Sequence, residues 1–122
     1  MYAMTESDFK LFKLECQKWL SFFGITEWEI SYLFESLDGT RAESRVNWCS
    51  RQCVFVLTTH SPKADRFDVQ KSAFHEVCEL LLTELELLAL DDEIPQEARR
   101  DMAESARHAV IRRLENSIFA KG

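Results

Sequence analysis

The sequence predicts an α+β domain in which one helix precedes a three-stranded antiparallel sheet and two helices follow it. Three observations support this prediction: a helical repeat of apolar residues over positions 6–23, a two-residue repeat that begins at Glu27, and a long apolar segment that ends before Pro95. The chain has 122 residues and contains no internal repeat or low-complexity tract. Residues 1–122 are therefore expected to form a single domain.

The first predicted helix covers residues 6–23, where lysines and a glutamine separate the apolar positions. Ser7 or Asp8 is expected to cap its start, because short polar side chains accept hydrogen bonds from free backbone N–H groups. Gly24 stands where a left-handed C-terminal cap would lie. The apolar positions of this amphipathic helix are Phe9, Phe12, Leu14, Cys16, Trp19, Leu20, Phe22 and Phe23.

Three strands are expected next. Alternation of polar and apolar residues over 27–35 predicts a half-buried strand, and Asp38-Gly39 marks a turn. Residues 41–49 and 52–59 give the second and third strands, of which the third is apolar on both faces. A short antiparallel meander follows, and helices must cover at least one of its faces.

Two helices close the predicted domain. A polar loop over residues 60–66 leads to a helix from about Asp68 to Leu90, which is apolar almost all round and is therefore expected to be central. Residues 91–95 interrupt it, and Pro95 suits the first turn of a third helix that extends to about Phe119.

Composition excludes some classes of partner. Fifteen Lys and Arg against 21 Asp and Glu give a net charge of -6, which disfavours nucleic acid and anionic membrane surfaces. The arginines at 99, 100, 107, 112 and 113 could form a local basic patch, but they are interpreted as a solvated helix face. The first residues do not form a secretory signal and no segment is apolar enough to span a bilayer, so we expect a cytoplasmic protein.

The four cysteines are expected to be reduced thiols that act as small buried hydrophobic residues. Cys49 and Cys53 could face each other across a tight turn. They lack the two-residue spacing of a zinc knuckle, however, and the chain offers no second pair. The other two cysteines are Cys16 and Cys78.

One segment carries a chemical signal. His75 and Glu79 are one helical turn apart, at the margin of the main apolar face of the second predicted helix. A carboxylate buried beside an imidazole needs a partner, since an unpaired buried charge costs several kcal/mol. The two groups can hydrogen-bond each other, pair with an arginine, or coordinate a cation.

Residues 74–82, Phe-His-Glu-Val-Cys-Glu-Leu-Leu-Leu, resemble the active helix of zincin metallopeptidases, above all the small SprT-like and phage-encoded members. The resemblance in element order covers roughly residues 26–117. It implies that His75 is the first zinc ligand and that Glu76 is the general base that activates a metal-bound water. Position 79 departs from the family, which has His there. Glu79 could still ligate zinc through oxygen.

The resemblance also implies a third zinc ligand from the last helix. Glu104 and His108 are four residues apart, and Glu104 is preferred because projection places it at the edge of the apolar face. The alternatives are a surface salt bridge for Glu104, with Arg100 or Arg107, and an exposed helix-surface position for His108.

Two functions remain open at this point. The first is a zinc-dependent peptidase of phage or prophage type, degenerate in its motif, that acts on a peptide or protein in the host cytoplasm. The second is an acidic protein-binding module without catalysis, for example a phage inhibitor of a host defence or regulatory protein. The Leu-rich second helix also leaves open a helix-mediated homodimer.

Overall fold

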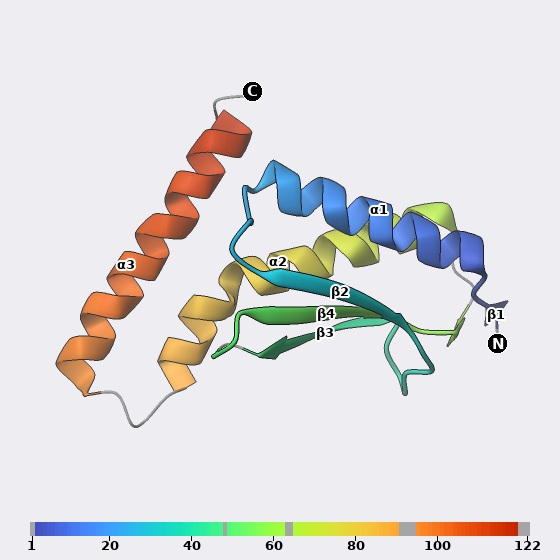
Figure 1. Cartoon of the computed structure of the whole chain (residues 1–122), viewed down its shortest axis with the longest axis horizontal. Coiled ribbons are helices and arrows are strands. Elements are labelled where there is room, and N and C mark those ends of the chain that lie inside the picture. Colours follow the sequence, from blue (N-terminus) through green and yellow to red (C-terminus); the bar gives the residue numbers. More distant parts are fainter. Residues whose placement is uncertain (1, 48, 63–64, 91–94, 120–122) are drawn as a thin grey trace.

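The computed structural model of the chain describes residues 2–47, 49–62, 65–90 and 95–119 (Figure 1). It confirms a mixed α+β architecture, with α1 and α2 on one side of the larger sheet and α3 beside the end of this layer. The elements are β1 (Tyr2–Ala3), α1 (Glu6–Phe22), β2 (Glu29–Phe34), β3 (Ala42–Asn47), β4 (Gln52–Leu57), β5 (His60–Ser61), α2 (Arg66–Leu90), α3 (Gln96–Leu114) and the π-helical turn η1 (Glu115–Phe119).

Helix α1 starts two or three residues earlier than a cap at Ser7 or Asp8 would allow. Thr5 is the N-cap, and its hydroxyl accepts a 3.1 Å hydrogen bond from the backbone N–H of Asp8. The Asp8 carboxylate accepts in return from the backbone N–H of Thr5 at 2.9 Å. This reciprocal capping box satisfies two free donors at once. Gly24 has a φ of +68°, which confirms the left-handed residue expected after the helix.

The larger sheet has the order β2-β4-β3, and its topology differs from the predicted one. β4 runs antiparallel to β3 but parallel to β2, so the prediction of a purely antiparallel meander was wrong. The chain passes from β2 to the far edge before it returns along the middle. This order gives the central place to β4, in which Cys53, Phe55, Val56 and Leu57 are fully buried. A strand that is apolar on both faces gains most from two neighbours.

The core lies between this sheet and the two helices that cover it. β4 presents Cys53, Phe55 and Leu57 to the helices, and residues one or two turns apart on each helix pack against them. Burial of such side chains contributes roughly 1.5–3 kcal/mol each. The fully buried helix residues are Phe12 and Cys16 of α1 and Val69, Ala73 and Val77 of α2.

Charged side chains form ion pairs across the opposite face of the sheet. Arg45 of β3 forms ion pairs with Glu43 and with Glu35, which directly follows β2. Because β4 lies between β3 and β2, the Arg45 side chain crosses the central strand. Val56 is fully buried although it faces away from the helices.

Helices α2 and α3 begin close to their predicted positions. Asp65 and Asp68 exchange hydrogen bonds of 2.9 and 3.0 Å at the start of α2. Pro95 directly precedes α3, in place of lying in its first turn. Residues 91–94, expected to break the helix, lie outside the described residues. No helix in the described ranges is long and apolar enough to cross a membrane.

Candidate functional site

Glu76 is turned toward the sheet. Its side chain is 7% exposed, and its Oε1 accepts a 2.7 Å hydrogen bond from Ser44 of the edge strand β3. Ser44 is the register partner of Phe55, so both residues face the helices. Burial raises the pKa of the Glu76 carboxyl above its ordinary value, and the Ser44 hydrogen bond opposes this shift by favouring the ionised form. Glu76 thus belongs to the contact between helix and sheet.

His75 and Glu79 pair with each other in solvent. The imidazole Nε2 lies 3.2 Å from Oε1 of Glu79, and the two side chains are 67% and 50% exposed. The prediction that this pair lies at the margin of the main apolar face was wrong. The buried side of α2 is set by Val69, Ala73 and Val77, and successive residues advance by about 100° around the axis. His75 and Glu79 therefore fall on its outer side.

The third expected ligand lies elsewhere. Glu104 and His108 are 3.8 Å apart on α3, and each side chain is 59% exposed. Ala106 and Val110 define the packed face of α3, and the helical projection places Glu104 and His108 on the opposite side. The sequence projection placed Glu104 at the edge of the apolar face, and this prediction was wrong.

These positions allow a test of the implied zinc site. A catalytic zinc takes three protein ligands. Within the described part of the chain no three His, Cys, Asp or Glu side chains gather around one point. His75 and Glu79 offer two donors that can reach a common ion, and Glu104 does not join them. The described residues do not fit a three-ligand zinc centre.

The cysteines divide into buried and accessible thiols. Cys16 and Cys53 are fully buried, and burial raises the pKa of Cys53 to about 12. Cys78 is partly buried. Cys49 is exposed in the turn after β3, which contradicts the expectation that all four are buried. All four are free thiols.

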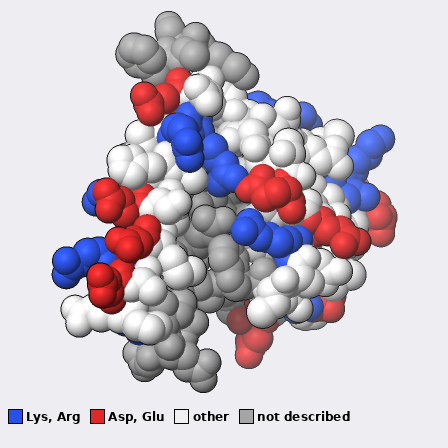
Figure 2. Space-filling model, turned by 60° about the vertical axis from the view of Figure 1, so that its left-hand side comes forward, with Lys and Arg blue, Asp and Glu red and all other residues white. Residues whose placement is uncertain are grey.

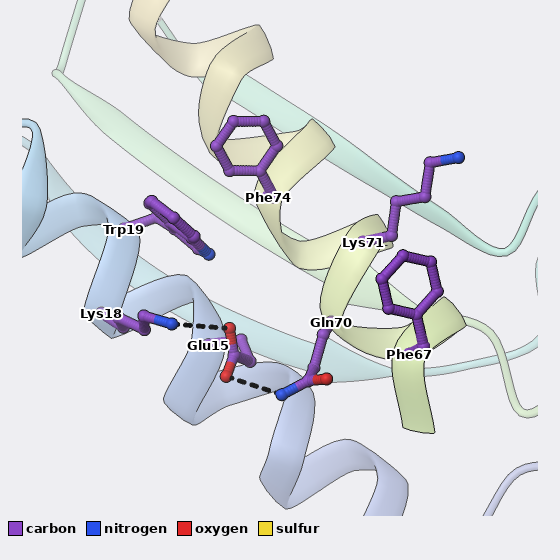
Figure 3. A pocket seen from close by; sticks show the side chains of 7 residues that line it. All are labelled: Glu15, Lys18, Trp19, Phe67, Gln70, Lys71 and Phe74. Atoms are coloured by element: carbon purple, nitrogen blue, oxygen red, sulfur yellow. Dashed lines mark hydrogen bonds and ion pairs between the residues drawn. The ribbon is translucent and has the colours of Figure 1, made fainter. Parts of the chain in front are cut away.

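A groove that the sequence analysis did not identify lies between α1 and α2 (Figure 3). Its volume is about 400 Å³. Trp19 and Phe74 meet edge to face across it, with ring centroids 4.7 Å apart. Phe74 is 38% exposed and Phe67 is 66% exposed. The lining residues are Glu15, Lys18, Trp19, Phe67, Gln70, Lys71 and Phe74.

Polar groups line the groove from both helices, Glu15 and Lys18 from α1 and Gln70 and Lys71 from α2. Glu15 accepts a 3.1 Å hydrogen bond from Nε2 of Gln70 and lies 3.8 Å from the ammonium of Lys18. The same ammonium stands 4.8 Å from the ring centroid of Trp19. The spacing of Phe67 and Phe74, seven residues apart on one face of a helix, was the available sequence signal. It was missed because Phe67 precedes the predicted helix start at Asp68.

On the face that includes α3, positive and negative side chains are mixed, and neither forms a continuous patch. Figure 2 shows Lys and Arg interspersed with Asp and Glu on the face it presents. Arg113 near the end of α3 is paired with Glu27. The interpretation of the α3 arginines as a solvated helix face is confirmed for Arg100, Arg107 and Arg112, which are exposed, but was wrong for Arg99 and Arg113, which are partly buried.

Comparison of the chain with protein-family models, with curated proteins and with solved structures finds no match.

Proposed function

We propose that the chain is a protein-binding domain, built on a zincin-like arrangement of helices and strands, that holds a peptide segment of its partner in the α1–α2 groove. The observation that carries this proposal is the exposure of Phe67 and Phe74 beside Trp19. Apolar patches rimmed by polar residues mark interaction sites on soluble proteins. Aromatic side chains are also the residues most enriched at interface hot spots.

The chemistry of α2 is compatible with this proposal. His75 is paired with Glu79 in solvent, and Glu76 is bound to Ser44. Each of these groups already has a partner within the chain. The resemblance to phage-encoded zincins makes a host defence or regulatory protein our candidate partner.

The experiment is a selection of random peptides on the immobilised full chain, followed by affinity measurements on purified variants. Peptides that bind through the groove should lose at least about tenfold in affinity to Phe67→Ala, as expected for truncation of an interface anchor. The matched control is Leu14→Ala, which removes an exposed apolar side chain of α1 that does not line the groove. Selected peptides should bind this control as they bind the parent chain.

Two results would count against the proposal. One is a selection that enriches no binding peptide. The other is a set of binders that do not distinguish Phe67→Ala from Leu14→Ala. Because Phe67 is two thirds exposed, its removal should leave the fold intact. An unchanged melting curve of Phe67→Ala would establish this.

The second candidate is a zinc metalloprotein related to the peptidases, with Glu76 as the residue that the resemblance assigns as base. One observation favours it: Nε2 of His75 and Oε1 of Glu79 converge at 3.2 Å, close enough to share one cation. The described residues supply no third donor, so we derive no catalytic step from this pair.

Metal content and thermal melts test the second candidate. A bound zinc would raise the melting temperature by mass action, and a chelator would lower it again. His75→Ala should abolish this response, while His108→Ala, which removes the histidine of the other exposed pair, should retain it. A melt indifferent to both zinc and chelator, with no metal in the purified protein, would exclude this function.

A further inference from the structure

We infer that the α1–α2 groove selects a peptide segment that places an apolar side chain next to a carboxylate. This inference rests on the proposed function and adds to it the chemistry of the partner. It depends on the aromatic walls of the groove, on the charges at its rim, and on the partners those charges already have.

The aromatic walls define the apolar half of the ligand. Figure 3 shows Trp19 from α1 facing Phe74 from α2, with Phe67 about two turns nearer the start of α2. A volume of about 400 Å³ lies at the small end of the range for ligand pockets and suits a few side chains, not a folded surface. An aliphatic or aromatic anchor inserted here would remove the exposed rings from water.

The rim charges define the polar half. Lys18 and Lys71 stand on opposite sides of the groove, and Glu15 is the one carboxylate among the described residues that line it. The lining residues therefore carry two positive charges and one negative charge, on a chain whose net charge is -6. A local positive field on an acidic molecule selects acidic ligands.

The existing contacts strengthen this charge preference. The Glu15 side chain is only 13% exposed and is engaged by Lys18 and Gln70. A cationic ligand would have to displace these contacts. Among the described residues, Lys71 is within ion-pair distance of no carboxylate. The pKa of Asp68 is lowered by a hydrogen bond from the Asp65 backbone and, more weakly, by the charge of Lys71, so Asp68 is the carboxylate with which an incoming acid would share this ammonium.

The same reasoning argues against a second copy of the chain as the occupant. Two copies that met groove to groove would bring two surfaces of equal net positive charge together. Like charges brought together in this way suppress association. The homodimer that the Leu-rich helix leaves open would then use another surface.

The test uses two blocked peptides, acetyl-Glu-Phe-Leu-Glu-amide and acetyl-Lys-Phe-Leu-Lys-amide, titrated into the ¹⁵N-labelled full chain. The acidic peptide should shift the indole N–H resonance of Trp19 and the side-chain amide of Gln70. Its affinity should exceed that of the basic peptide by about fivefold, the factor expected for an exposed ion pair worth ~1 kcal/mol. Added salt should reduce this ratio.

Lys71→Glu should reverse the preference, whereas the matched control Lys10→Glu should keep it. Lys10 is exposed on α1 and does not line the groove. Both substitutions replace a lysine by a glutamate, so they change the net charge equally. Phe67→Ala should weaken both peptides.

The outcomes separate the inference from the proposed function. Equal binding of both peptides at Trp19 and Gln70, or a preference that survives Lys71→Glu, overturns the acidic partner but leaves a peptide-binding groove. The absence of any shift at these resonances with either peptide counts against both. Shifts at Trp19 that grow with protein concentration alone would assign the groove to a second copy and overturn the inference.

Discussion

Ser44 of the edge strand β3 donates a 2.7 Å hydrogen bond to Oε1 of Glu76, and its hydroxyl also lies 3.3 Å from the backbone carbonyl of the same residue. One hydroxyl thereby ties the edge of the sheet to the middle of α2. The neighbouring His75 points into solvent. The two residues of the motif that resemble a catalytic pair are thus divided between the interior and the surface.

Ser44→Ala should destabilise the fold by about 1–3 kcal/mol, because it leaves a buried carboxylate without its hydrogen-bond donor. Urea denaturation of both proteins measures the difference. Ser31→Ala is the matched control, since Ser31 is exposed on β2, and its effect should stay within about 0.5 kcal/mol. Equal effects of the two substitutions would contradict the role assigned to Ser44.

Glu76→Gln should raise stability at pH 7 relative to the parent chain, and this advantage should shrink at pH 4. The reason is that burial raises the pKa of Glu76 in the folded state. The folded protein then holds this proton more tightly than the unfolded chain. Its contribution to stability is complete below the unfolded pKa and is lost as pH rises through the folded pKa.

Thermal melts at both pH values measure this effect, and the difference between variant and parent should change by roughly 2–5 °C. Gln keeps a side-chain oxygen that can accept from Ser44. A variant that is less stable than the parent at pH 7, by an amount that shrinks at pH 4, would show that the ionised carboxylate is needed. Equal differences at both pH values would show that protonation of Glu76 does not contribute.

His75→Ala should change the stability of the metal-free protein by no more than about 0.5 kcal/mol, because exposed i, i+4 ion pairs contribute little. Chemical denaturation in the presence of a chelator is the measurement. Glu79→Ala should behave in the same way. A loss above about 1.5 kcal/mol for either would mean that the pair is more buried in solution than its exposure indicates.

Cys49 should react with a maleimide in the native state at least about tenfold faster than Cys16 and Cys53, because only accessible thiols form reactive thiolates near neutral pH. Mass spectrometry of peptides at timed intervals locates the label. Cys49→Ser should remove the fast phase. In denaturant all four cysteines should react at similar rates, and fast labelling of Cys53 in the native protein would contradict its position in β4.

The sequence by itself determined the three helices and the three strands of the larger sheet. It did not determine the short strands β1 and β5, which pair with each other, and the prediction of a loop at residues 60–66 was wrong for His60 and Ser61. Periodic spacing shows which side chains share a face of a helix or strand, as over residues 6–23 and after Glu27. The break near Pro95 marks where one helix ends and the next begins. Such rules act between near neighbours in the chain. For that reason α1, the three strands and both later helices lie where they were expected, and Gly24 has the left-handed backbone that its place required.

Only the tertiary structure decided which surfaces meet. Alternation fixes the two faces of a strand but not its neighbour, so the parallel pairing of β2 with β4 was not encoded in any local pattern. A helix that is apolar almost all round does not say which side is covered, and packing against α1 and the sheet left His75 and Glu79 outside. The groove exists only because two helices far apart in sequence bring Trp19 and Phe74 together.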